Sequence, residues 1–100
     1  MPYAPLLSEP ETAAALGSAA DWRRDGDTIV RTIECPTFRG AIDLVNRVAD
    51  AAEEADHHPD FTINWRRVTF TLTTKASHGL TAKDFSMAAT IDRLAGEGAG

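Results

Sequence analysis

Apolar residues recur every three or four positions between Thr37 and His57, the spacing that gathers them on one face of an α-helix. Thr37 is suited to cap the start of this helix, and Pro59 forces the chain out of helical geometry after its end. A second such segment begins at Thr81 and runs to about Ala95. The predicted buried stripes are Phe38, Ile42, Val45, Val48 and Ala52 on the first helix, and Phe85, Ala88, Ile91 and Ala95 on the second.

Alternation of apolar and polar residues, the period of a β-strand, appears at 61–65 and at 68–73. The β-branched and aromatic residues of these segments also favour strands. Two earlier strands are predicted at 22–24 and 28–35, because the Asp-Gly pair between them is a strong hairpin signal. The Arg66-Arg67 dipeptide between the later strands is a poor tight turn, which leaves the register of that hairpin open.

A short first helix is predicted from Ser8, a good N-cap with acidic residues just after it, to about Leu16. The resulting order, α-β-β-α-β-β-α, predicts an α+β fold in which a four-stranded antiparallel sheet has three helices packed on one face. A chain of 100 residues is the size of one domain. We assign that domain to 1–95, and the composition of 96–100 predicts a flexible tail.

Composition and charge narrow the classes of function. The net charge of −5 argues against a broad nucleic-acid surface, which needs clustered lysine and arginine. The single cysteine, Cys35, cannot form an internal disulfide. No apolar run approaches the roughly 18 residues that span a bilayer, and the N-terminus lacks the basic and apolar regions of a signal peptide. A cytoplasmic protein without membrane contact is therefore expected.

The segment from Glu53 to Pro59 carries the residues best suited to chemistry. It places His57 and His58 side by side where a helix ends. Glu53 precedes His57 by four residues, so its carboxylate could fix the tautomer of that imidazole, while His58 would point about 100° away. Two imidazoles beside carboxylates could carry protons at neutral pH. The alternative is that both histidines only complement the negative end of the helix dipole.

Metal binding is a second interpretation of the histidines. His57, His58 and His78, together with Asp56, could supply nitrogen and oxygen ligands. However, adjacent residues seldom point at one ion, and the sequence has neither a His-x-x-x-His motif nor a cysteine pair. We therefore predict no metal site.

Three more residues have both a structural and a functional interpretation. Asp84 follows Thr81 by three positions, the spacing of a capping box, and a cap would explain it without any catalytic role. Trp22 and Trp65 could stack on a flat ring, although large aromatic side chains more often pack in a core.

The stretch from Glu53 to Asp84 resembles the signature of the pterin-4a-carbinolamine dehydratase family. In that signature an acidic residue and three spacers precede His-His-Pro. An aromatic residue, a threonine-rich strand, Gly-Leu-Thr or Gly-Leu-Ser, and an Asp then follow. The matching residues are Glu53, His57-His58-Pro59, Trp65, 69–74, Gly79-Leu80-Thr81 and Asp84. Trp22 before a hairpin and Phe38 at the start of the long helix extend the resemblance over most of the chain.

The resemblance implies a hydro-lyase that dehydrates 4a-hydroxytetrahydropterin, the 4a-carbinolamine, to quinonoid dihydropterin in the recycling of tetrahydropterin. The resemblance implies no metal or organic cofactor. It does imply that the protein forms a homodimer or homotetramer. One proton must reach the departing hydroxyl and another must leave a ring nitrogen, which is general acid–base work. By the resemblance, His57 and His58 bind the pterin in one shared pocket and handle its protons. The other substrate-binding residues that it implies are Glu53, Asp56, Pro59, Trp22 and Asp84.

One position departs from the family pattern. A third active-site histidine usually follows the threonine-rich strand, and Lys75 stands there in this chain. A lysine ammonium can donate a proton but is a poor base at neutral pH. We therefore predict reduced dehydratase activity, with His78 or Lys75 as a partial catalytic substitute.

The alternative function is a non-catalytic one. Proteins of this kind can serve as dimerisation partners of transcription factors or as assembly factors of a carbon-fixing enzyme, and the missing third histidine favours such a role. The intact Glu53, Asp56, His57 and His58 favour the enzyme, because a partner role needs no proton carriers in a pocket.

Overall fold

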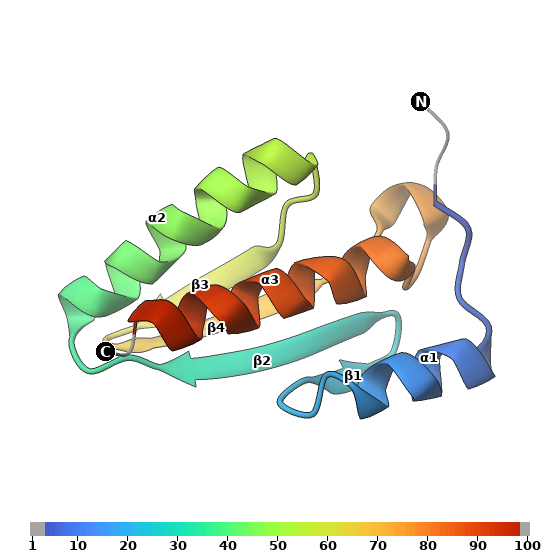
Figure 1. The fold of residues 1–100 in the computed structure, drawn as a ribbon, viewed down its shortest axis with the longest axis horizontal. Coiled ribbons are helices and arrows are strands. Elements are labelled where there is room, and N and C mark those ends of the chain that lie inside the picture. Colours follow the sequence, from blue (N-terminus) through green and yellow to red (C-terminus); the bar gives the residue numbers. More distant parts are fainter. Residues whose placement is uncertain (1–3, 99–100) are drawn as a thin grey trace.

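The structure, a computed structural model, describes residues 4–98 (Figure 1). Its class and its element order, α-β-β-α-β-β-α, are those predicted. A single turn of 3-10 helix, η1, follows the last strand. The elements are α1 (Glu9–Gly17), β1 (Arg23–Asp25), β2 (Thr28–Glu34), α2 (Phe38–Ala55), β3 (Asp60–Asn64), β4 (Arg67–Leu72), η1 (Lys75–Ser77) and α3 (Ala82–Gly98).

The sheet has the strand order β1-β2-β4-β3, with every neighbouring pair antiparallel. The strands β2 and β4 are therefore central, and β1 and β3 are the edges. Figure 1 shows α2 and α3 lying over one face of the sheet and α1 lying beside β1. Because α2 and α3 run in opposite directions, the end of α2 and the start of α3 meet at the same end of the molecule.

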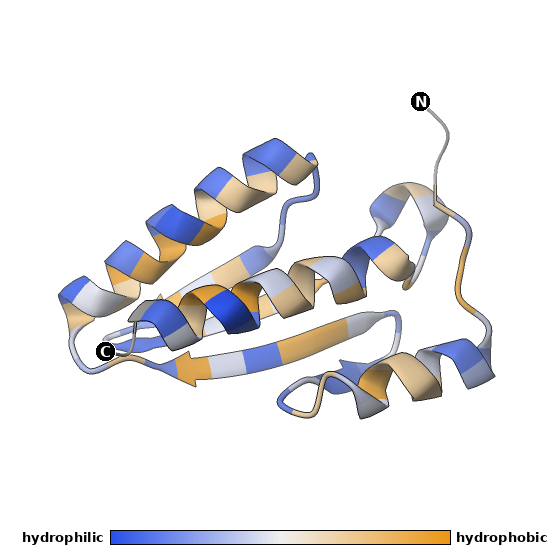
Figure 2. Cartoon of the chain, in the orientation of Figure 1, coloured by the Kyte–Doolittle hydropathy of each residue, from blue (hydrophilic) through white to orange (hydrophobic). Residues whose placement is uncertain are grey.

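The core forms where the alternating side chains of β4 meet α2 and α3. Val68, Phe70 and Leu72 are fully buried, as their period of two predicts. On α2 the stripe is turned from its predicted position, and Figure 2 shows mostly polar residues on the side of this helix away from the sheet. Its buried residues are Ala41, Leu44, Val48 and Ala52, whereas Phe38 is 53% exposed and Ile42 and Val45 are half-buried.

The stripe of α3 was predicted correctly in its centre. Ala88 and Ile91 are fully buried, while Phe85 and Ala95 are half-buried. Met87 and Leu94 are buried in their place. In both helices the apolar residues cover more than one narrow stripe, so the spacing alone does not decide which edge of the stripe faces the sheet.

The β3–β4 turn corrects one predicted boundary. Asn64 pairs with Arg67, so the two turn residues are Trp65 and Arg66, and β3 ends one residue before the predicted Trp65. Trp65 has φ of 57°, which few bulky residues adopt, and it is 66% exposed with the Arg66 guanidinium carbon 4.5 Å from its ring centroid. Trp65 is therefore neither a strand residue nor a core residue.

The ends of the chain also differ from the prediction. The helix α3 continues through Gly98, three residues beyond the predicted Ala95, so it includes the first three residues of the predicted tail. Residues 1–3 and 99–100, which belonged to the predicted domain and tail, lie outside the described residues. None of the helices within 4–98 combines the length and the apolar character of a membrane-spanning segment.

Candidate active site

The two histidines follow a sharp change of direction at the end of α2. Asp56 caps the helix in the left-handed conformation, with φ of 53°, and its N–H faces the carbonyl oxygens of Ala52 and Glu53. The N–H of His57 also donates to the Ala52 oxygen, at 3.1 Å. Because the chain leaves helical geometry before His57, the two imidazoles are not placed by the helical repeat.

His57 is held by a carboxylate from the far helix. Its Nε2 lies 2.7 Å from Oδ1 of Asp84, at the start of α3. The Asp84 side chain is fully buried and that of His57 is 11% exposed. The predicted partner, Glu53, was wrong, because the spacing of four residues aligns two side chains only while both are helical and α2 ends at Ala55.

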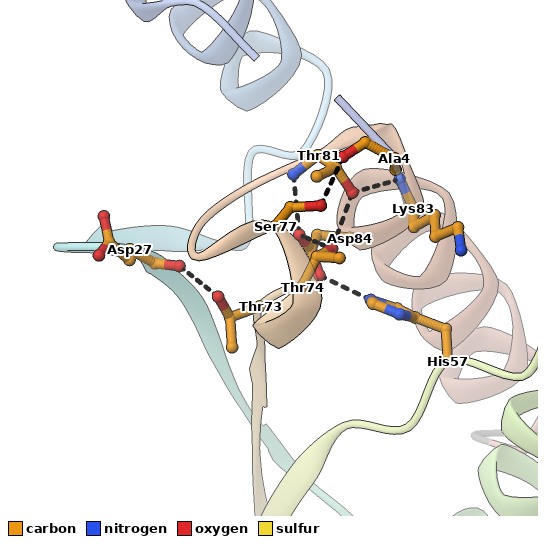
Figure 3. A network of polar contacts seen from close by, with 9 residues as sticks. All are labelled: Ala4, Asp27, His57, Thr73, Thr74, Ser77, Thr81, Lys83 and Asp84. Atoms are coloured by element: carbon orange, nitrogen blue, oxygen red, sulfur yellow. Dashed lines mark hydrogen bonds and ion pairs between the residues drawn. The ribbon is translucent and has the colours of Figure 1, made fainter. Parts of the chain in front are cut away.

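Asp84 is the third residue of α3, and it makes the bond back to the Thr81 N–H that the predicted capping box requires of it. Its Oδ2 accepts hydrogen bonds from the Thr81 N–H at 2.9 Å and from the Thr74 hydroxyl at 2.8 Å. The Thr81 hydroxyl oxygen accepts in turn from the Lys83 N–H at 3.2 Å. Figure 3 shows these residues gathered around the carboxylate, with His57 reaching it from the opposite side. Capping and holding His57 are therefore compatible roles of one side chain.

The sequence reasoning missed the part played by two threonines. Thr74 and Thr81 are buried, and their hydroxyl oxygens are 2.7 Å apart beside Asp84. The sequence pattern identifies Thr74 only as a member of the threonine-rich strand. The signal that could have revealed it was the period-two pattern itself, since Thr74 continues the inward-facing series of Val68, Phe70 and Leu72 and is therefore a polar residue at a buried position.

His58 forms a separate and more exposed pair. Its Nε2 lies 2.5 Å from Oε2 of Glu53, with 55% and 77% of the two side chains exposed. Beside this pair, a mainly apolar groove of about 250 Å³ lies between α2 and the β3 edge of the sheet. The groove is lined by Val45, Val48, Ala49, Ala52, Glu53, His58, Pro59, Phe61 and Phe70.

His57 instead lines a larger, more polar cleft between α2 and α3, with a volume of about 640 Å³. Among the residues that the structure describes, the two imidazoles thus open onto different cavities, and the predicted shared pocket is not formed by this single chain. The other residues lining the cleft are Arg47, Asp50, Ala51, Glu54, Ala55, Lys83, Ser86, Met87, Thr90, Arg93 and Leu94.

The remaining candidates lie apart from these pairs. Lys75 and His78 are exposed in and after η1, and neither lines the cleft or the groove. Trp22 is buried, and its Nε1 donates to Asp92 Oδ1 at 2.9 Å. Asp92 lies eight residues along α3 from Asp84, about 12 Å at the helical rise. This position favours the packing interpretation of Trp22.

The described residues do not favour metal binding or thiol chemistry. Within 4–98, no group of three or more His, Cys, Asp or Glu side chains is placed to hold a metal ion. Burial raises the pKa of the Cys35 thiol, an effect that the charge of Arg47 partly opposes. A raised thiol pKa leaves less of the reactive thiolate at neutral pH, so Cys35 is not equipped as a nucleophile.

The protein is a small α+β domain that carries two imidazole–carboxylate pairs at the end of α2. Residues 5–94 match the family model described as pterin 4 alpha carbinolamine dehydratase, and the chain belongs to this family. A protein of Nocardia farcinica is 53% identical over 90 residues, which are 90% of this chain and 95% of that protein. A protein of Mycolicibacterium smegmatis is 47% identical over 89% of this chain and 95% of its own length. Both are named, provisionally, pterin-4-alpha-carbinolamine dehydratase.

Two solved structures are similar to this one. A transcriptional coactivator/pterin dehydratase from Brucella melitensis has a TM-score of 0.86 and 31% identity, covering 89% of this chain and 97% of that chain. A pterin dehydratase-like protein identified as a RuBisCO assembly factor in the alpha-carboxysome has a TM-score of 0.67 and 23% identity, covering 76% and 90%. The second likeness shows the fold alone.

Proposed function

We propose that this protein dehydrates a 4a-hydroxytetrahydropterin to quinonoid dihydropterin by general acid–base catalysis, in support of tetrahydropterin recycling. The observation that carries the proposal is the contact of His57 with the fully buried Asp84. A buried carboxylate that orients an imidazole is a recurrent part of sites that transfer protons. Membership of the family supplies the substrate class.

The reaction is an elimination of water, and it needs no oxidant or reductant. A proton is delivered to the 4a-hydroxyl, the bond from C4a to that oxygen breaks, and water leaves. A proton then departs from a ring nitrogen, so that a carbon–nitrogen double bond replaces the lost bond. A proton donor and a proton acceptor are needed, and imidazoles serve as both near neutral pH.

We assign His58 the direct contact with the substrate. It is far more exposed than His57, and Glu53 holds its ring from the helix side. The groove beside it has mainly apolar walls that suit the face of a flat ring, and Glu53 and His58 are the polar residues that line it. His57, fixed by Asp84, opens onto the separate cleft instead of this groove, and the proposal keeps it as the second proton carrier.

A direct dehydration assay with a 4a-hydroxypterin tests the function. His58→Ala is expected to lower the rate by about 10²-fold, the lower end of what general acid–base catalysis contributes. Arg39→Ala is the matched control, because Arg39 is exposed on the first turn of α2 and lines neither the groove nor the cleft. A wild-type rate no higher than the uncatalysed one, or an equal loss in both variants, would refute the proposal.

The same assay tests the position of the missing third histidine. Lys75→His is expected to raise the rate by about tenfold, less than the roughly 10²-fold that a wholly absent acid–base group would cost, because Lys75 or His78 is proposed to supply part of the function already. His78→Ala is expected to lower it if His78 supplies part of that function from the neighbouring loop. An unchanged rate in both variants would rule out the idea that either residue acts as a substitute.

The second candidate is a non-catalytic role as a dimerisation or assembly partner of another protein. Lys75 in the position of the third histidine is the observation that favours it. The Brucella melitensis protein is named for both a coactivator and a dehydratase role. The dehydration assay separates the two candidates, since a purely structural partner has no turnover to lose in His58→Ala.

We also propose that the protein forms a homodimer or homotetramer through the outer edge of β3. This edge strand contains neither proline nor lysine, the residues that commonly block edge pairing, and Phe61 on it is 47% exposed. Light scattering is expected to give two or four times the mass of one chain, and Phe61→Lys to reduce that mass. A monomeric wild type at the concentrations of the assay would contradict this.

A further inference from the structure

We propose that Thr74 is a positioning residue, which acts through Asp84 to decide which nitrogen of His57 carries the proton. Its catalytic consequence rests on the function proposed above, while the structural inference stands on the hydrogen bonds alone. Thr74, Thr81 and Asp84 are each at most 5% exposed, so water does not compete for their polar atoms. Figure 3 shows the side chains of Thr74 and Thr81 next to that of Asp84, which His57 reaches from another side.

The direction of every hydrogen bond in this network can be assigned. The Thr74 hydroxyl lies 2.8 Å from a carboxylate oxygen of Asp84, which accepts, so the single hydroxyl proton of Thr74 points there. The contact of 2.7 Å between the Thr74 and Thr81 hydroxyls must then use the proton of Thr81. Thr81 in turn accepts from the Lys83 N–H. All of these donors are therefore oriented toward Asp84.

The same count fixes the state of Asp84 and His57. Oδ2 of Asp84 already accepts from Thr74 and from the Thr81 N–H, so it has no place for a proton of its own. Only Oδ1 faces Nε2 of His57, at 2.7 Å. No other hydrogen bond of the described residues reaches Oδ1, so we take Oδ1 as the acceptor and the Nε2–H group of His57 as the donor. Neutral His57 is therefore the Nε2–H tautomer, and Nδ1 is the nitrogen free to exchange protons.

Thr74 is the threonine whose hydroxyl donates directly to the Asp84 carboxylate, so its removal acts directly on Asp84. The backbone of Thr74 is held independently of the carboxylate. Its N–H donates to the Gly79 carbonyl oxygen at 3.1 Å, and its carbonyl oxygen accepts from the Gly79 N–H at 3.4 Å. Without the hydroxyl, Oδ2 keeps only the Thr81 N–H and the carboxylate can turn toward that donor. His57 then loses part of its preference for the Nε2–H form.

The chain provides a matched control five residues earlier. Thr69 on β4 also forms a contact between two threonine hydroxyls, at 2.8 Å from Thr32 on β2. That pair is exposed and makes no contact with a carboxylate in the described residues. Thr74→Val and Thr69→Val remove the same hydroxyl from the same kind of pair, and only the first is expected to reach His57.

The test is the pair of ring nitrogen-15 chemical shifts of His57 in the whole protein, followed across a pH titration. In the wild type at a pH where His57 is neutral, Nε2 is expected to have the shift of a protonated nitrogen and Nδ1 that of an unprotonated one. Thr74→Val should change the ratio of the two tautomers about three- to tenfold, the effect expected from one hydrogen bond. Thr74→Ser should restore the wild-type ratio, and Thr69→Val should leave it unchanged.

Each outcome decides the inference. A neutral wild-type His57 protonated on Nδ1 would overturn it, as would a folded Thr74→Val with the wild-type ratio or an equal change in Thr69→Val. If Thr74→Val does not fold, the wild-type shifts still decide the tautomer, and Thr81→Val, which removes the donor to Thr74, must change the ratio in the same direction. Expected shifts in a protein without dehydratase turnover would refute the proposed function alone, and turnover with Nδ1 protonated would refute the positioning role alone.

Discussion

Asp84→Ala is expected to lower the free energy of unfolding by about 3–5 kcal/mol, as is typical when one partner of a buried charged pair is removed. The variant leaves three donors inside the protein without their acceptor: the Thr81 N–H, the Thr74 hydroxyl and Nε2 of His57. Each unsatisfied buried group costs about 1–3 kcal/mol. Since domains of this size are stable by about 5–15 kcal/mol, the variant should be close to unfolding.

Urea unfolding at neutral pH, followed by circular dichroism, measures this loss. Asp84→Asn is the matched variant, because it keeps the volume and one acceptor oxygen and should lose less. Its amide nitrogen cannot accept the Nε2 proton of His57, so under the proposed function the folded variant should also dehydrate the pterin more slowly. A loss below about 1 kcal/mol in Asp84→Ala would show that water replaces the carboxylate and that the network is not as closed as its burial indicates.

The fold was predictable because local signals and the core agree. The caps at Ser8 and Thr37 are both formed, by hydrogen bonds from the N–H groups of Glu11 and Gly40. The segment whose apolar and polar residues alternate most regularly is β4, and it is the most buried strand of the sheet. Such signals act within a few residues, so they do not depend on how distant segments meet.

The site was less predictable, because its contacts join residues distant in the sequence. His57 and Asp84 are 27 residues apart, and only the antiparallel packing of α2 on α3 brings them together. The left-handed Asp56 gave no sequence signal as strong as glycine would have given, so the helix was extended to His57 and the wrong carboxylate was assigned. The pairing of Glu53 with His58 follows from that one residue.

The prediction of the turn in the last hairpin was wrong for a similar reason. Trp65 occupies a positive φ that the sequence rules assign to glycine or asparagine, and its alternation with Phe61 and Ile63 suggested a strand. The tight β3–β4 register, with Ile63 opposite Val68, imposes this turn from both sides. Tertiary pairing thus overrides the local preference of one residue.

Phe70→Ala is expected to lower the free energy of unfolding by about 3–5 kcal/mol, the range for removing a large aromatic side chain from a core. Phe70 is fully buried, with 0% of its surface exposed. It lies on the central strand β4, paired with Arg31 of β2 on one side and with Phe61 of β3 on the other. Its ring centroid is 6.2 Å from that of Phe61, and it also forms part of the floor of the groove beside His58. Truncation therefore opens a cavity between the sheet and α2.

Phe38→Ala is the matched control for this second variant, because Phe38 is 53% exposed at the start of α2 and should lose less than about 1 kcal/mol. Phe70→Leu, which keeps most of the volume, should lose less than Phe70→Ala. The comparison uses urea midpoints at a common slope, so that a changed denatured state is not mistaken for lost packing. Equal losses in Phe70→Ala and Phe38→Ala would mean that the sheet is not held by the β4 side chains, and the arrangement that brings α2 and α3 to the candidate site would need another explanation.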